Sequence, residues 1–96
     1  MYIGVCSFTI RLPENHSLKG KRRIIRSFSV RIINKFNVSC AEVSATDKWQ
    51  IGEIAIVTVS NSAKHTDRML QKIIHYVENQ KNEFEIVEME SDVIQY

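Results

Sequence analysis

The order in which helix-like and strand-like apolar patterns follow one another constrains the fold more than any other feature of this sequence. Short segments whose apolar residues either alternate with polar ones or follow one another without a break are typical of strands. They occur at residues 2–12, 38–46, 52–60 and 83–94. Apolar residues spaced by three or four positions indicate helices at residues 17–36 and 63–79. The predicted order of elements is therefore β-α-β-β-α-β.

This order leaves few possible topologies. Each βαβ half requires a right-handed crossover, and the short polar connection 46–50 between the second and third strands predicts a hairpin. A ferredoxin-like α+β domain satisfies both conditions, with a four-stranded antiparallel sheet in the order 4-1-3-2 and two helices on one face. Because 96 residues bury only one core of useful size, residues 1–96 are predicted to form a single domain.

The charge of the chain is divided unevenly along its length. The net charge is only +2, but residues 1–48 hold nine Lys or Arg against three Asp or Glu, whereas residues 49–96 hold four against eight. The first half is thus net basic and the second net acidic. Two interpretations follow: the basic half binds an anionic partner, or the acidic fourth strand folds back and neutralises it.

The predicted helix 17–36 contains most of the cations and no acidic residue. Ser17 is a suitable N-cap, and an apolar stripe of Leu18, Ile25, Phe28, Ile32 and Phe36 is expected to face the core. Lys21 is the exception among the cations, because its angle on the helix falls inside the apolar arc. We expect Lys21 either to extend its ammonium to solvent from the helix end or to meet a polar partner, for which Glu42 is a candidate.

The start of this helix is a candidate anion-binding site. Free amides and the helix dipole attract anions there, and cations are kept at this end against an unfavourable dipole interaction. We therefore predict contacts with a nucleic-acid backbone from Ser17, Lys19, Lys21, Arg22, Arg23 and Arg26. A solvated helix face and a small phosphoryl ligand are the alternatives.

Several short motifs together resemble the YlxP-like family of small bacterial proteins. They are Arg11-Leu12-Pro13, Ser17-Leu18-Lys19, Lys21-Arg22, Phe36-Asn37-Val38, Ala41-Glu42-Val43, Trp49-Gln50 and Val59-Ser60-Asn61. The resemblance implies a ferredoxin-like domain of unknown function. It also implies genes clustered with those for a large translation initiation factor and ribosome-binding factor A, and hence a role near the ribosome or its RNA. Gly20 departs from the family pattern, which commonly has an acidic residue there, so a Ser-x-x-Glu capping box is lost.

Trp49 and the open face of the sheet are two further candidates for contacts. Trp49, in the hairpin loop, could stack on a base, anchor a dimer or pack over the sheet edge. Arg11 is expected on the open face, where strand one has no aromatic residue, so the pattern of a standard RNA-recognition module is absent. Exposure of Val57 and Val59 on this face would instead favour a homodimer.

No arrangement of residues predicts catalysis. The histidines have no metal-ligand spacing, and residues 13–16 lack the glycine-rich anion loop of acylphosphatases, which share this order of elements. We expect a non-enzymatic protein with no metal and no cofactor. Cys6 and Cys40 are expected to be buried free thiols, and the lack of a signal peptide or an apolar membrane segment favours the cytoplasm.

Overall fold

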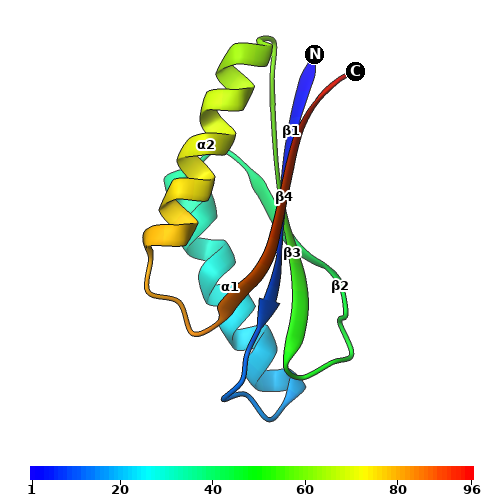
Figure 1. Cartoon of the computed structure of the whole chain (residues 1–96), viewed down its shortest axis with the longest axis vertical. Helices are drawn as coiled ribbons and strands as arrows, with labels where there is room; N and C mark the ends of the chain where they lie inside the picture. Colours follow the sequence, from blue (N-terminus) through cyan, green and yellow to red (C-terminus); the bar gives the residue numbers. More distant parts are fainter.

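The computed structural model describes residues 1–96, and its elements follow the predicted order. They are β1 (Tyr2–Arg11), α1 (Leu18–Lys35), β2 (Ser39–Ser44), β3 (Ile51–Ser60), α2 (Ala63–Asn79) and β4 (Glu85–Gln95). All strand pairs are antiparallel, and the strand order β2-β3-β1-β4 is the predicted 4-1-3-2 counted from the opposite edge. Figure 1 shows both helices on one side of the sheet, which confirms the ferredoxin-like α+β fold.

The core lies between the two helices and the inner face of the sheet. On β1 the even-numbered side chains Cys6, Phe8 and Ile10 are buried, because successive residues of a strand point to opposite faces. Gly4 lies on the same face of β1 and faces α2. A Cβ at Gly4 would lie 2.7 Å from Thr66 Cγ2, so the close approach of α2 requires glycine there.

The structure corrects several predicted boundaries by one or two residues, and two of these differences bear on the site. The second strand ends at Ser44 rather than Thr46, because its register with β3 shifts between Glu42 and Ser44 and Ala45 has a left-handed backbone with φ 58°. The first helix ends at Lys35, and Phe36 is extended with φ −129° and ψ 150°. Neither difference changes the topology, but the early end of β2 leaves residues 45–50 as a longer loop.

This loop lies against the segment that leads from β1 into α1. The Leu12 amide donates to the Gln50 carbonyl oxygen at 2.9 Å, and Gln50 Nε2 donates to the Asn15 carbonyl oxygen at 3.0 Å. The start of α1 and the β2–β3 loop therefore form one end of the molecule, the lower end in Figure 1. Neither α1 nor α2 combines the length and the apolar character needed to span a membrane.

Candidate nucleic-acid interface

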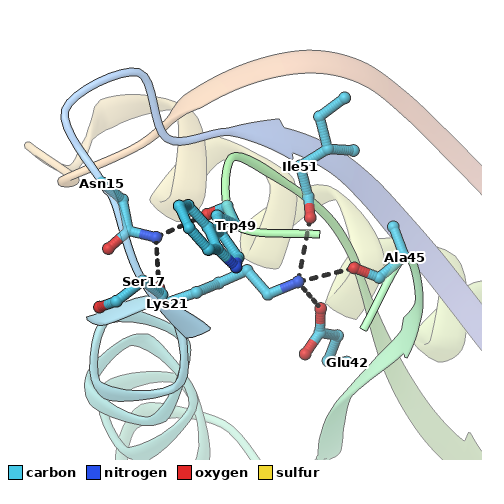
Figure 2. Close-up of polar contacts among 7 residues, drawn as sticks. All are labelled: Asn15, Ser17, Lys21, Glu42, Ala45, Trp49 and Ile51. Atoms are coloured by element: carbon cyan, nitrogen blue, oxygen red, sulfur yellow. Dashed lines mark hydrogen bonds and ion pairs between the residues drawn. The ribbon is translucent and has the colours of Figure 1, made fainter. Parts of the chain in front are cut away.

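The first turn of α1 is fixed by a cap and by a neighbouring buried asparagine. Ser17 is the N-cap, as predicted, and its Oγ accepts a hydrogen bond from the Gly20 amide at 2.9 Å. Asn15 is buried, and its Nδ2 donates to the Ser17 carbonyl oxygen at 2.8 Å and to the Trp49 carbonyl oxygen at 2.6 Å. Figure 2 shows this side chain joining the helix start to the loop. Sequence reasoning missed Asn15, because its role depends on a contact with a residue 34 positions away.

The position of Asn15 leaves no room for a side chain at Gly20. A Cβ at Gly20 would collide with Asn15 Oδ1 and would lie 3.0 Å from Ser17 Oγ. The glycine thus leaves room for the asparagine, which uses its amide group to fix the first turn in place of a capping box. No acidic residue remains in the first turn of α1.

Lys21 lies inside the protein, unlike the other predicted contact residues. Its side chain is fully buried, and Nζ is 2.8 Å from Glu42 Oε2. Nζ also donates to the carbonyl oxygens of Ala45 at 2.6 Å and Ile51 at 3.1 Å (Figure 2). The expected polar partner is therefore Glu42, and we no longer include Lys21 among the residues able to contact a ligand.

The remaining four predicted cations, Lys19, Arg22, Arg23 and Arg26, are exposed. Arg23 has a distant acidic partner, with Nη1 3.8 Å from Glu83 Oε2 and both side chains more than 60% exposed. Lys19, Arg22 and Arg26 form no ion pair with an acidic residue. The start of α1 therefore presents three unneutralised positive charges on the surface.

The acidic residues of β4 lie mostly on the opposite side of the sheet. Glu88 and Glu90 pair with Thr9 and Ser7, which alternate with the buried Phe8 and so belong to the open face. The sheet consequently separates these carboxylates from the helices. The fourth strand as predicted, residues 83–94, offers an acidic partner to Arg23 through Glu83, but it forms no ion pair with Lys19, Arg22 or Arg26.

Lys19, Arg22 and Arg26 lie on one side of α1, within about 60° of one another at about 100° per residue. Arg22 precedes Ser29 by seven residues, nearly two turns, so the two share a side of the helix. Ser29 Oγ donates to the Cys40 carbonyl oxygen at 3.4 Å, which shows that this side faces β2. Arg31 lies on the other side, where its Nη2 donates to Asn82 Oδ1 at 3.2 Å. Lys19, Arg22 and Arg26 therefore form a basic surface along one side of α1, and Arg22 is the one of the three nearest the side that faces β2.

The two residues proposed for stacking or interface contacts have different surroundings. Trp49 belongs to the loop beside the start of α1, and 54% of its surface is exposed. Arg11 lies at the end of β1 in an ion pair with Glu85, whose Oε2 is 2.8 Å from Arg11 Nη2. Trp49 thus lies beside the start of α1, whereas Arg11, at an odd-numbered position of β1, lies on the open face of the sheet.

The open face of the sheet has an apolar part and an acidic part. Val57 and Val59 are exposed there, and Ile3 pairs with both Val59 and Ile94. Ser7 and Thr9 line a shallow depression with three carboxylates, those of Glu53, Glu88 and Glu90. Both valines are therefore exposed, as a homodimer formed through this face would require.

The cysteine thiols take no part in this surface. Cys6 and Cys40 pair with Ile56 from opposite sides, so the width of β3 separates them and both are free. Burial, with a smaller contribution from Cys40, raises the pKa of the Cys6 thiol from 9.0 to about 12. Burial also raises the pKa of Cys40, which is partly exposed rather than fully buried as we expected. Neither thiol is activated as a nucleophile.

Comparison with known proteins supports the resemblance in the sequence. Residues 3–91 match the model of a family described as "Protein of unknown function (DUF503)". The chain is also 36% identical over 77 residues to "Uncharacterized protein YlxP" of Bacillus subtilis (strain 168), and this match covers 80% of the chain and 84% of the relative. Both descriptions leave the activity open, so any function has to be argued from the molecule itself.

Proposed function

Because the chain belongs to the DUF503 family of proteins of unknown function, we propose a function from its surface. The proposed function is non-enzymatic binding of structured RNA, in which the exposed cations of α1 contact the phosphate backbone. The exposure of Lys19, Arg22 and Arg26 without acidic partners is the observation that carries this proposal. Phosphate contacts by such residues provide affinity for nucleic acid without reading its sequence.

The arrangement of the cations favours an extended anion over a small one. Lys19 and Arg26 are separated by seven residues, or about 10 Å along the helix axis. Their side chains project from the convex surface of a helix and do not converge on an enclosed cavity. A polyanion with regularly repeated phosphates can contact them together, whereas a single phosphate group would reach only one or two. The gene association implied by the family resemblance makes ribosomal RNA the first RNA to test.

The experiment compares two variants that lose the same charge. Lys19→Ala/Arg22→Ala/Arg26→Ala removes the proposed contacts, and Lys64→Ala/Arg68→Ala/Lys72→Ala removes three exposed cations from α2. Binding of structured ribosomal RNA is measured by filter retention at several salt concentrations. We expect the α1 variant to bind about ten- to a hundredfold more weakly with a reduced salt slope, and the α2 variant to resemble the wild type. Equal losses in both variants would show that only the net charge matters.

The exposed apolar part of the open face supports a second candidate function, a homodimer. Val57, Val59 and Ile94 would be covered by the same residues of a second copy. The neighbouring carboxylates of Glu53, Glu88 and Glu90 would repel their counterparts, so added salt should strengthen the dimer. Salt weakens RNA binding, and the two functions therefore respond to salt in opposite ways. Monomeric behaviour in sedimentation at high protein concentration would contradict the dimer.

A further inference from the structure

We infer that the RNA bound by α1 presents an unpaired base that stacks on Trp49. This inference rests on the proposed function and specifies its ligand: a loop or bulge of structured RNA in preference to a continuous duplex. Three observations carry it, namely the exposure of the indole, the fixed backbone beneath it and its position beside the basic surface.

Trp49 is exposed although its surroundings are ordered by hydrogen bonds. More than half of its surface, 54%, contacts solvent. Exposing so much of a large aromatic side chain forgoes the stabilisation that burial provides. The protein covers only part of the ring, and the exposed part is available to a partner.

The backbone that carries the indole is held at several points. Lys21 Nζ donates to the carbonyl oxygens of Ala45, the first residue of the loop, and Ile51, the first residue of β3. Asn15 Nδ2 holds the Trp49 carbonyl oxygen itself at 2.6 Å (Figure 2). Gln50 Nε2 adds a bond to the Pro13 carbonyl oxygen at 3.3 Å. The loop is therefore preorganised, which reduces the entropy lost when the ring contacts a ligand.

The position of the ring places it next to the proposed phosphate contacts. The amide of Asn15 bridges the backbone of Trp49 to that of Ser17, the N-cap of α1. Arg22 lies on the side of α1 that faces β2, the strand that leads into this loop. An RNA strand that contacts Lys19 and Arg22 through its phosphates can therefore turn a base toward the indole. Stacking of this kind needs a free base face, which a loop or bulge offers and a duplex does not.

Charge argues against a second copy as the partner of Trp49. A two-fold symmetric interface brings the same patch of both molecules together. An interface centred on Trp49 would bring Lys19 and Arg22 near their own counterparts, and neither has an acidic partner that would offset this repulsion. RNA provides both an aromatic face and negative charge, so it fits this surface better.

The sequence contains a single tryptophan and three tyrosines, so fluorescence excited at a wavelength that only tryptophan absorbs reports on this ring alone. The wild type is titrated with a hairpin RNA that has a short unpaired loop and with a fully paired duplex of the same phosphate number. We expect the hairpin to quench the fluorescence and the duplex to bind with little quenching. Trp49→Ala should weaken hairpin binding about tenfold or more without changing duplex binding, and Trp49→Phe should retain part of the preference. Circular dichroism and thermal unfolding confirm that both variants fold.

The outcomes separate this inference from the function on which it rests. If both RNAs bind equally, without quenching and without an effect of Trp49→Ala, the inference is wrong and the proposed function stands. If neither RNA binds the wild type, both are wrong. If Trp49→Ala changes the sedimentation of the protein but not its RNA binding, Trp49 contacts protein, which also overturns the inference.

Discussion

Lys19 and Lys21 are two residues apart on α1 and have the same charge, but the structure gives them opposite surroundings. Lys21 is fully buried, and its ammonium is surrounded by Glu42 and two backbone carbonyl oxygens. Lys19 is exposed and has no acidic partner. Two positions on a helix correspond to a rotation of about 200°, enough to move a side chain from the core to solvent. The difference shows that a count of cations in a segment does not define a binding surface; their angles on the helix must also be known.

The largest effect is expected from removing the buried cation. Lys21→Met leaves the Glu42 carboxylate without its counter-ion and the carbonyl oxygens of Ala45 and Ile51 without their shared donor. Breaking a buried ion pair at one partner costs about 3–5 kcal/mol, and the free energy of unfolding should fall by an amount near the lower figure because 15% of the Glu42 side chain is exposed. Urea denaturation followed by circular dichroism measures the loss.

The matched control is Lys19→Met on the same helix. Its free energy of unfolding should stay within about 0.5 kcal/mol of the wild type, because an exposed substitution removes no contact that stabilises the fold. Similar losses in Lys21→Met and Lys19→Met would contradict the distinction between the two lysines.

Gly20→Ala tests how tightly the single residue between Lys19 and Lys21 is packed. Alanine favours a helix over glycine by about 1 kcal/mol, so a gain in stability would be expected if the first turn were open. The new Cβ would instead collide with Asn15 Oδ1 and displace a side chain that makes two hydrogen bonds. Loss of these bonds costs about 1–3 kcal/mol, so we expect a net destabilisation of up to about 2 kcal/mol in chemical denaturation. Stabilisation by Gly20→Ala would show that Asn15 is not held as described.

How far the sequence predicts this region depends on whether a contact is local or distant. The angle of Lys21 around the predicted helix placed it among the residues that face the core. The same sequence analysis also counted Lys21 among the cations expected to contact an anion. The absence of an acid at position 20 was visible in the sequence, but its steric cause was not. The cause is the Asn15 side chain, whose position is set by its hydrogen bond to Trp49 in the β2–β3 loop. This loop begins where β2 ends early at its bulge. Periodicity predicts elements and faces, whereas such contacts between loops leave no periodic signal.

Lys19→Glu separates stability from binding at a single exposed position. A carboxylate in the first turn interacts favourably with the helix dipole, so the free energy of unfolding should rise by about 0.3–1 kcal/mol. The same change replaces a proposed phosphate contact with a repulsive charge and should weaken RNA retention. Thermal unfolding and filter binding on one preparation measure both effects. A variant that gains stability and still binds RNA as the wild type does would remove Lys19 from the proposed interface.

The smallest effect is expected for the exposed ion pair of Arg11 and Glu85, which extends the comparison from single charges to pairs. Arg11 Nε and Nη2 both approach Glu85 Oε2, at 3.2 and 2.8 Å, but the two side chains are 59% and 54% exposed. A double-mutant cycle should give a coupling energy of about 0.2–1 kcal/mol that disappears in 1 M salt, because water and ions screen exposed charges.

The same cycle on Lys21 and Glu42 should give a larger coupling that salt hardly changes, since ions cannot reach a fully buried ammonium. Equal salt sensitivity in the two cycles would mean that solvent reaches Lys21, and the distinction between the buried and the exposed charges of α1 would then lose its physical basis.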